Sequence, residues 1–258
     1  MNIQIYVAAH KLYKMPTNKI YRPIFVGAAI SSRVPLNYQP DNTGDNISIK
    51  NPNFNELTAI YWIWKNCHAN VKGIVQYRRY LAVKPKRYLN GILNGNDIEQ
   101  LLSQRDVIVP RKRHYYVETN YSHYIHAHHQ EPLDTVRQVI VMDYPDYLAD
   151  YDCQMHKTSA HMFNMMIMPT KQFDAYAKWL FSILFKVESM VDISNYDRRE
   201  ARVFGYLSEL LLDVWLTHQQ LSCAEVPVMY MERQQLPAKT YNMLKRKLFP
   251  QAVKHTHF

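Results

Sequence analysis

The chain has 258 residues, of which 47% are hydrophobic and 21% are charged. At about 150 residues per domain this is one large domain or a domain with a sizeable extension, and the composition excludes a disordered chain, a collagen-like chain and a small disulfide scaffold. Lysine and arginine number 31 against 22 acidic residues, a net charge of +9, which predicts attraction to anions such as nucleotide phosphates, nucleic acid or anionic lipid.

Residues 1–10 have neither the basic region nor the apolar region of a signal peptide. We therefore expect them to form a first strand and not a secretion signal. Cys67, Cys153 and Cys223 lie far apart with no C-x-x-C spacing, so we expect reduced, buried thiols and a cytosolic compartment. The most apolar stretches fall well below the roughly 18 residues that a membrane span requires. We therefore expect a cytoplasmic protein that does not cross a bilayer.

Strands and helices alternate along the sequence. Hydrophobic periodicity predicts strands over residues 3–8, 23–29 (a strand or a turn), 71–77, 106–109 and 162–168, and helices over 55–66, 97–105 (with Asn96 as a possible cap), 133–142, 172–187 and 196–217. Residues 35–53 are expected to form a loop, and residues 111–132 a long connection rich in aromatic residues and histidine. This alternation favours an α/β fold with a mainly parallel sheet. Ligands in such sheets bind beyond the carboxyl ends of the strands.

An apolar strand runs directly into Tyr77-Arg78-Arg79-Tyr80. Arginine keeps its charge and binds phosphate in a bidentate fork, and tyrosine can stack on a base or sugar and donate its hydroxyl. The two arginines therefore suit a diphosphate. A structural pair that neutralises nearby acids is an equally good interpretation.

The polar loop 41–48, followed by Lys50, Asn51 and Glu56, is a second candidate site. It lacks the register of an EF-hand, which excludes that calcium motif. Short carboxamides and carboxylates such as those of Asp45 and Asn46 recognise uracil edges and ribose hydroxyls well, so the loop could contact a nucleotide. Polar loops also often just cap helices.

A histidine cluster occupies the long connection, with members His114, His123, His126, His128 and His129. It has neither helical i, i+4 spacing nor fixed cysteine or carboxylate partners, so it is a weak zinc signal. A sugar acceptor could meet this segment, and a plain surface loop is at least as good an interpretation. Another alternative is a nucleic-acid-binding protein that uses Tyr115, Tyr116, Tyr121 and Tyr124 as a stacking platform.

The helix predicted over 196–217 carries a buried stripe from Val203 to Val214 at i, i+3, i+4, i+7 spacing. Arg202, Gly205, Glu209 and Asp213 lie on the opposite side. A missing side chain at position 205 would let a ligand or another backbone approach, which makes Glu209 a candidate general base. The alternative is a solvated face with salt bridges.

The last segment, residues 239–258, contains Lys245-Arg246-Lys247 among apolar residues. Such a basic amphipathic pattern could rest on anionic lipid, or it could be a docking helix with a frayed end. We expect one domain over residues 1–238 and a basic amphipathic tail over 239–258.

Several motifs in combination resemble one protein family over roughly residues 2–235. They are His10-Lys11, Gly44-Asp-Asn-Ile-Ser48 with Asn51 and Glu56, Trp62-x-Trp-Lys-Asn66, Tyr77-Arg-Arg-Tyr80, Glu118-x-Asn-Tyr121, Phe163-Asn-Met-Met-Ile-Met168 and Gly205-Tyr-Leu-Ser-Glu209. The chain resembles a bacterial capsule and exopolysaccharide family that was long catalogued as a domain of unknown function and is now regarded as glycosyltransferases. The resemblance implies a UDP-sugar-dependent hexosyl- or galactofuranosyltransferase with a GT-A-like α/β fold and a helical C-terminal portion.

The resemblance also implies roles for individual residues. Tyr77 to Tyr80 stand where GT-A enzymes commonly place a metal-binding Asp-x-Asp motif, so Arg78 and Arg79 would replace the cation, with no metal or other cofactor required. Glu209 would deprotonate the acceptor in an inverting reaction. The donor would be bound by Ala9, His10, Lys11, Asp45, Asn46, Ser48, Asn51, Tyr77, Tyr80 and Asn164, and the acceptor by Tyr121, His126 and Arg202. The expected partners are a nucleotide sugar and a glycan or lipid-linked glycan, with peripheral contact to the inner face of the plasma membrane and no nucleic acid.

Overall fold

The computed structural model describes residues 1–84 and 89–232. Its strands are β1 (Ile3–Ala9), β2 (Tyr21–Phe25), β3 (Gln39–Pro40), β4 (Val71–Gln76), β5 (Arg79–Leu81), β6 (Val107–Pro110), β7 (Arg113–His114), β8 (Ser159–Ala160), β9 (Met166–Pro169), β10 (Cys223–Val226) and β11 (Val228–Tyr230). Its α-helices are α1 (Asn51–Phe54), α2 (Leu57–Asn66), α3 (Gly95–Leu102), α4 (Asn120–Ala127), α5 (Gln130–Asp143), α6 (Leu148–His156), α7 (Thr170–Glu188) and α8 (Val203–His218).

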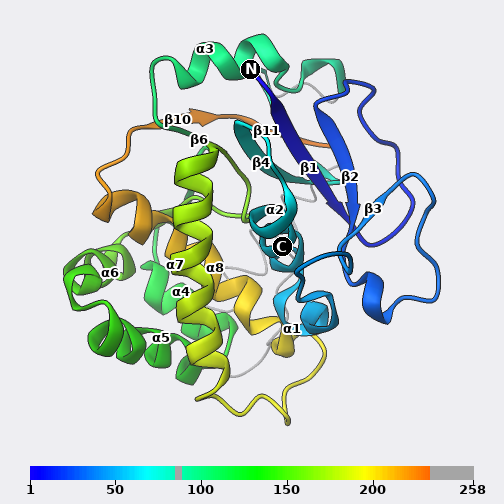
Figure 1. The fold of residues 1–258 in the computed structure, drawn as a ribbon. Helices are drawn as coiled ribbons and strands as arrows, with labels where there is room; N and C mark the ends of the chain where they lie inside the picture. Colours follow the sequence, from blue (N-terminus) through cyan, green and yellow to red (C-terminus); the bar gives the residue numbers. More distant parts are fainter. Residues whose placement is uncertain (85–88, 233–258) are drawn as a thin grey trace.

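One mixed sheet organises the molecule (Figure 1). The strand order is β10-β6-β9-β4-β1-β2-β3, with β5 and β11 attached beside β4. Strands β4, β1, β2 and β3 pair in parallel, and so do β6 and β10, while β9 runs antiparallel between β4 and β6. The mostly parallel sheet predicted from the sequence is confirmed, with β9 as the inverted strand.

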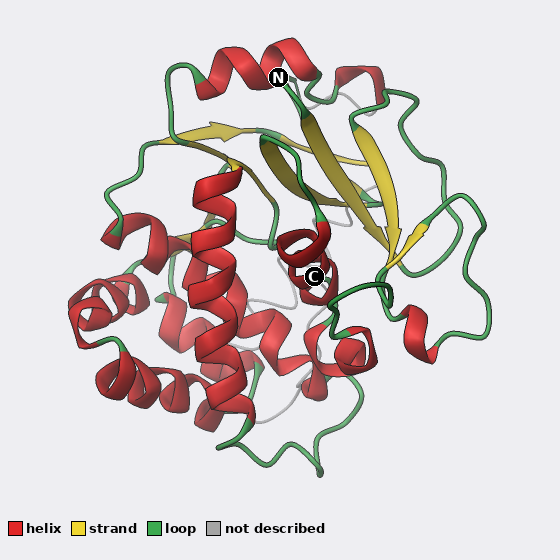
Figure 2. Ribbon diagram, in the orientation of Figure 1, coloured by secondary structure: helices red, strands yellow, loops and turns green. Residues whose placement is uncertain are grey.

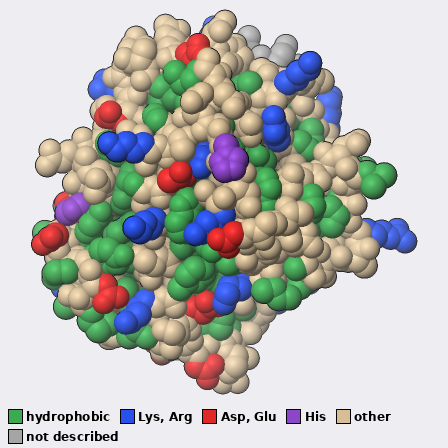
Figure 3. Space-filling view, viewed as in Figure 1, with side chains coloured by type: hydrophobic (Ala, Val, Ile, Leu, Met, Phe, Trp, Pro, Cys, Tyr) green, Lys and Arg blue, Asp and Glu red, His purple; other side chains and the backbone are tan. Residues whose placement is uncertain are grey.

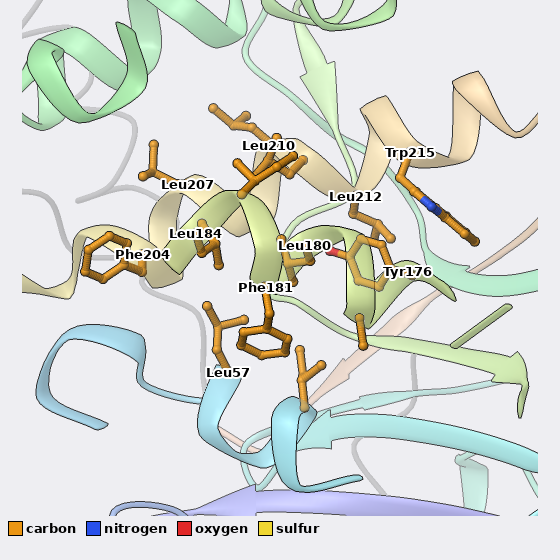
Figure 4. Close-up of a cluster of buried hydrophobic side chains, with 14 of the residues drawn as sticks. Leu57, Tyr176, Leu180, Phe181, Leu184, Phe204, Leu207, Leu210, Leu212 and Trp215 are labelled. Carbon is orange, nitrogen blue, oxygen red and sulfur yellow. The ribbon is translucent and has the colours of Figure 1, made fainter. Parts of the chain in front are cut away.

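The two faces of the sheet bury separate cores (Figure 2). On one face, α2, α7 and α8 pack around Leu57, Leu180, Phe181 and Leu207, as the close-up of this cluster shows (Figure 4). On the other face, α3 and the loops after β1 and β2 cover residues such as Ile5 and Tyr80. Because parallel strands buried on both faces are nearly continuous hydrophobic runs, β1 and β4 were the strands easiest to locate in the sequence.

The observed elements mostly agree with the expected ones, with several corrections. The helix expected over 196–217 begins only at Val203, and helix α6 and strands β10 and β11 were not expected. Helix α3 begins at Gly95 with Asn94, not Asn96, as its cap. The loop expected over 35–53 contains β3 and the start of α1. The connection expected over 111–132 contains β7, helix α4 and the start of α5. Strand β9 begins at Met166, because Phe163 and Asn164 have φ values of 80° and 51°, which no strand residue adopts.

Helix α8 lies inside the molecule, which excludes the solvated face considered for it. Gly205 and Asp213 are buried, and the Asp213 carboxylate accepts from the His161 backbone N–H at 2.8 Å and lies 2.6 Å from the His161 Nδ1. The expectation of buried thiols fails in part, because Cys153 is exposed and Cys223 only half-buried, although all three cysteines are free. Among the described helices, none combines the length and the apolar character needed to span a membrane. The predicted tail over 239–258 lies outside the described residues.

Candidate active site

The carboxyl edge of the sheet gathers several polar segments. Strands β1, β2, β4, β6 and β10 all end at this edge, and the inverted strand β9 begins there. The segment His10-Lys11 follows β1, the turn at Tyr77 and Arg78 follows β4, and Phe163-Asn164 precedes β9. Ligands of open α/β sheets bind at such an edge, so this is the candidate site.

The two adjacent arginines point to different surroundings. Arg79 opens β5, which pairs antiparallel with the end of β4, so Tyr77 and Arg78 form the tip of a tight turn. The half-exposed Arg78 lies 3.2 Å from the Glu232 carboxylate. Arg79 is more buried; it donates to Gln76 Oε1 at 2.5 Å and its guanidinium lies 4.5 Å from the centre of the Phe163 ring. The two guanidinium groups therefore cannot be treated as one fork.

Tyr77 is the centre of the outer, positively charged part of the site. It is 6% exposed, and the His10 ring meets it edge-on at 5.3 Å between centroids. The Lys11 ammonium and the Arg78 guanidinium lie 5.7 and 5.0 Å from the centre of its ring. Burial lowers the pKa of His10, and the charges of Lys11, Arg78 and Arg202 lower it further. A neutral imidazole among three cations is a setting that attracts an anion.

Glu209 forms the inner part of the site. Its side chain is partly exposed, yet burial of its carboxyl raises its pKa to about 7, and the charge of Glu56 acts in the same direction. The backbone N–H of Phe163 donates to Glu209 Oε1 at 3.0 Å, and the charges of Arg79 and Arg113 oppose the rise. A carboxyl group with this pKa can take up and release a proton near neutral pH.

The pair Phe163-Asn164 binds the two acidic residues of the site, Glu209 and Glu56. Its two consecutive left-handed residues turn the Phe163 N–H toward Glu209 and the Asn164 side chain toward Glu56. The Asn164 Nδ2 donates to Glu56 Oε1 at 2.8 Å and to the Gly205 carbonyl at 3.1 Å, and its Oδ1 accepts from the Ser208 hydroxyl at 2.8 Å. Asn164 is 1% exposed, so it positions the acids and does not present its amide to the open edge.

Arg202 directly precedes α8, and its charge acts on His10. Its Nε donates to Asn55 Oδ1 at 2.8 Å, and its guanidinium lies 5.7 Å from the centre of the Tyr206 ring. A Cβ on Gly205 would approach Asn55 Nδ2 to 2.9 Å. Glycine at 205 therefore leaves room for Asn55, which in turn holds Arg202.

The polar loop 41–51 lies mainly against other elements of the protein. Asp41 is fully buried and accepts from the backbone N–H groups of Gly27 and Ala28, both at 2.9 Å, and from the hydroxyls of Ser48 and Thr58. Asp45 bonds to the Tyr61 hydroxyl at 3.0 Å and lies 3.5 Å from Lys65, and Asn46 bonds to the Gly44 carbonyl at 2.9 Å. The Asn51 Nδ2 donates to the Asn55 carbonyl at 2.8 Å. Asp45 is thus attached to α2, and within the described part of the chain no hydrogen bond joins these side chains to Arg79 or Glu209.

Two further residues expected to bind the donor are buried. Tyr80 is 0% exposed in the core on the α3 face of the sheet, next to Tyr21. Ala9 is 1% exposed, and its carbonyl accepts from the Val26 N–H at 2.9 Å. At the edge itself, the expected donor residues that remain accessible are His10 and Lys11.

The histidine-rich segment is divided among several partners. The Glu118 carboxylate binds two histidines: its Oε2 lies 2.8 Å from His123 Nδ1, and its Oε1 lies 2.8 Å from His126 Nδ1. His128 stacks on Tyr206 at 4.1 Å, and His129 stacks on Tyr196 at 4.0 Å. Within residues 1–84 and 89–232, no three His, Cys, Asp or Glu side chains converge as metal ligands.

A small pocket joins this segment to Glu209. Its lining includes Tyr115, His123, Tyr124 and Tyr206 besides Glu209. Tyr115 and Tyr124 are 3% and 4% exposed, whereas Tyr116 is 83% exposed, so the tyrosines do not form the stacking platform considered for nucleic acid. The expected acceptor residues each bind a different partner: Tyr121 bonds to Asp134 at 3.1 Å, the exposed His126 to Glu118, and Arg202 to Asn55.

The sequence interpretation missed three residues of this site. The sequence analysis did not pair Glu56 with Glu209, and it singled out neither Arg113 nor Gln76. Gln76 binds Arg79 and also donates to the Phe163 carbonyl at 2.8 Å. The signal for Arg113 was its position after β6, at the same edge as the other strand ends.

Comparison with known proteins bears on the family and the fold of the chain. The model of a family described as "Domain of unknown function (DUF4422)" matches residues 4–220. A search of curated proteins gives no match. Among solved structures, the chain is similar to one described as a WbbM bifunctional glycosyltransferase in its apo form, with 28% identity and a TM-score of 0.81 over 90% of this chain. The match covers 46% of that protein, so the chain spans less than half of its length. The similarity confirms the predicted GT-A-like α/β fold.

Proposed function

We propose that this chain, which belongs to the DUF4422 family, is a glycosyltransferase that moves a sugar from a UDP-sugar to a glycan acceptor. The observation that carries the proposal is that Glu209, an acid with a pKa of about 7, and Arg79 interact electrostatically at the carboxyl edge of the sheet. The fold to which this sheet belongs is similar to that of a glycosyltransferase. A base and a fixed positive charge are the two groups that such a displacement needs. Galactofuranose is the donor sugar we would test first, because of the family resemblance of the sequence.

The reaction follows from these positions. The Glu209 carboxylate takes the proton of an acceptor hydroxyl, and the acceptor oxygen attacks the anomeric carbon of the donor. The bond from that carbon to the diphosphate oxygen breaks, and UDP leaves with the electron pair. Attack from the side opposite the diphosphate inverts the anomeric configuration.

The basic residues take the diphosphate. His10, Lys11, Arg78 and Arg202 form the outer anion-attracting group, and the charges of both Arg78 and Glu209 act on Arg79. Fixed guanidinium groups neutralise the negative charge that develops on the leaving diphosphate. We propose that they do so in place of a divalent cation.

The acceptor would approach Glu209 from the side of Tyr206 and Arg202. A lipid-linked glycan at the cytoplasmic face of the plasma membrane is the acceptor we propose, in the synthesis of a bacterial capsule or another surface polysaccharide. The positive net charge of the chain supports an acceptor held at an anionic surface.

Calorimetric titration of UDP, UDP-galactopyranose and UDP-galactofuranose tests the donor. We expect binding that persists in EDTA and weakens in the Arg78→Ala and Arg79→Ala variants. Binding that requires magnesium would overturn the role of the arginines, and the absence of binding to every UDP species would overturn the transferase proposal.

The rate at which the protein releases UDP from a UDP-sugar that it binds tests the role of Glu209 as the base. Glu209→Gln should abolish turnover while it preserves UDP binding, because the amide cannot accept the proton. Glu99→Gln, on the exposed side of α3, is the matched control. Full turnover by the Glu209→Gln variant would contradict the assignment.

A further inference from the structure

Exposed leucine and isoleucine side chains are confined to one region of the described chain. They are Leu12, Ile30, Leu36 and Ile49, with exposed fractions of 74%, 51%, 102% and 64%. Single exposed apolar residues are ordinary on a protein surface. Here, however, every exposed Leu or Ile of residues 1–84 and 89–232 falls within 38 positions, Leu12 to Ile49, on the loops that follow β1, β2 and β3.

Hydrogen bonds join these loops into one surface. The Tyr13 N–H donates to the Tyr38 hydroxyl at 3.0 Å, and that hydroxyl donates to the Tyr13 carbonyl at 3.1 Å. The Ala29 N–H donates to the Ser48 hydroxyl at 3.0 Å, which ties the short 3-10 helix Ala28–Ile30 to the 3-10 helix Ser48–Lys50. We call this surface the loop rim; it consists of residues 11–14, 28–38 and 48–50.

The loop rim is also strongly basic. Residues 1–40 contain Lys11, Lys14, Lys19, Arg22 and Arg33 and no aspartate or glutamate. Lys11, Lys14 and Arg33 are exposed on the loop rim, and among the described residues no carboxylate forms an ion pair with any of them. The carboxylates that contact the loop rim are already engaged. Asp41 is fully buried and accepts from the Ala28 N–H and the Ser48 hydroxyl. Glu232 pairs with Arg78, and Glu188 pairs with Lys50.

We propose that the loop rim docks the protein onto a membrane surface that contains anionic lipid. Protruding apolar side chains enter the boundary between headgroups and acyl chains, while lysine and arginine at the same depth bind the lipid phosphates. No apolar groove or pocket for a folded partner is needed for this contact. In the space-filling view, some basic and apolar side chains lie on the side where Figure 1 draws the loops after β2, and others are spread over the rest of this face (Figure 3).

Docking in this way also orients the candidate active site. His10 and Lys11 belong to the same loop as Leu12, and Tyr13 lies 4.9 Å from Tyr77 between ring centroids. The carboxyl edge of the sheet therefore borders the lipid surface, where a lipid-linked acceptor would be available. This last consequence rests on the proposed function, whereas docking itself does not.

Co-sedimentation of the full chain with vesicles tests the proposal. Vesicles of phosphatidylcholine alone are compared with vesicles that also contain phosphatidylglycerol. We expect binding to the anionic vesicles that weakens with salt. Leu12→Ser with Leu36→Ser, and separately Lys14→Glu with Arg33→Glu, should each reduce binding by about tenfold or more.

Two matched control variants separate docking from general surface effects. Val141→Ser with Met142→Ser removes exposed apolar residues from α5, and Lys178→Glu reverses an exposed charge on α7; both should bind vesicles like the unchanged chain. Failure of the unchanged chain to bind anionic vesicles, or full binding by either loop-rim variant, would overturn the proposal. Loss of binding in the charge variant alone, with competition by duplex DNA, would identify a polyanion surface and would also overturn it.

UDP titration of the same variants keeps this test independent of the proposed function. Leu12→Ser with Leu36→Ser should retain the UDP affinity of the unchanged chain. A chain that binds UDP but no vesicle contradicts only the docking, and a chain that binds vesicles but no UDP contradicts only the transferase.

Discussion

The guanidinium carbon of Arg79 lies 4.5 Å from the centre of the Phe163 ring. Gln76 holds both residues, because it accepts from Arg79 and donates to the Phe163 carbonyl. The backbone N–H of the same Phe163 binds Glu209. One short segment thus aligns a fixed positive charge and a titratable acid at the edge of the sheet.

The two arginines should respond differently to replacement. Arg79→Ala should lower kcat/KM by roughly a hundredfold to a thousandfold, as does loss of one group that stabilises developing negative charge. Arg78→Ala should mainly weaken UDP binding, because Arg78 is half-exposed and paired with Glu232. Steady-state kinetics of UDP release together with calorimetry distinguish the effects. Equal losses of turnover in both variants would contradict this division.

Replacement of Glu56 should change the pH dependence of the reaction. Turnover by a general base rises with pH as the base loses its proton, so the acidic limb should lie near the Glu209 pKa of about 7. Glu56→Gln removes a neighbouring negative charge that raises this pKa, so the limb should move to lower pH. A pH profile of kcat/KM measures the shift, and Glu99→Gln should leave the limb in place. A move to higher pH would refute the coupling of the two acids.

Glu209 should cost the protein stability at neutral pH. A folded-state pKa of about 7 lies above the ordinary value of 4.5, so the free energy of unfolding falls as pH rises from the lower value through the higher one. Glu209→Gln removes this loss and should unfold at a higher urea concentration than the unchanged chain at pH 8, with little difference at pH 4. Equal urea midpoints at pH 8 would show that the carboxylate is not penalised.

Gly205→Ala should disturb Arg202 more than the fold. The new Cβ would meet Asn55 Nδ2 at 2.9 Å, and the end of this side chain can move aside. The free energy of unfolding should change by no more than about 1 kcal/mol, because the higher helix propensity of alanine, worth about 1 kcal/mol, offsets the cost of moving Asn55. The displaced Asn55 would release Arg202, so UDP-sugar affinity should fall. Gly95→Ala is the control, because its Cβ would meet no atom within 4 Å.

Asp213→Asn tests the buried pair with His161. Burial raises the pKa of Asp213, but the hydrogen bond and charge of His161 outweigh it, so the pKa is lowered overall. This stabilisation is present above the unfolded-state pKa, about 4, and is lost as pH falls through the folded-state value. The variant should lose about 3–5 kcal/mol of unfolding free energy at pH 7 and less in acid. Denaturant titrations at both pH values, with Asp146→Asn as an exposed control, measure this difference.

The sequence predicted the regular part of the fold but not the geometry of the site. Strand β4 was located as a short apolar run, and helix α7 because its apolar residues follow the helical period. Helix α4 was missed because histidine and tyrosine occupy both of its sides, although Thr119 and Ser122 form a capping box. Arg78 and Arg79 looked equivalent because the sequence does not reveal that a tight turn separates them.

The parts of the site that the sequence did not predict depend on contacts between residues far apart in the chain. Glu56 and Asn164 are 108 positions apart in the chain, and no local pattern indicates that their side chains meet. The role of Glu209 could be guessed from its place on a helix, but its raised pKa depends on Glu56 and on burial. Both causes act only once the sheet has brought the segments together.

The contacts of Asn164 restrict how this protein can diverge. An aspartate at this position could not donate to Glu56, and a longer glutamine would not fit between Gly205 and Ser208. A lineage that replaces Glu56 would leave one N–H of the buried Asn164 amide without its acceptor, although the bond to the Gly205 carbonyl would remain. We therefore expect positions 56, 164 and 208 to be inherited as one unit and, where they change, to change together.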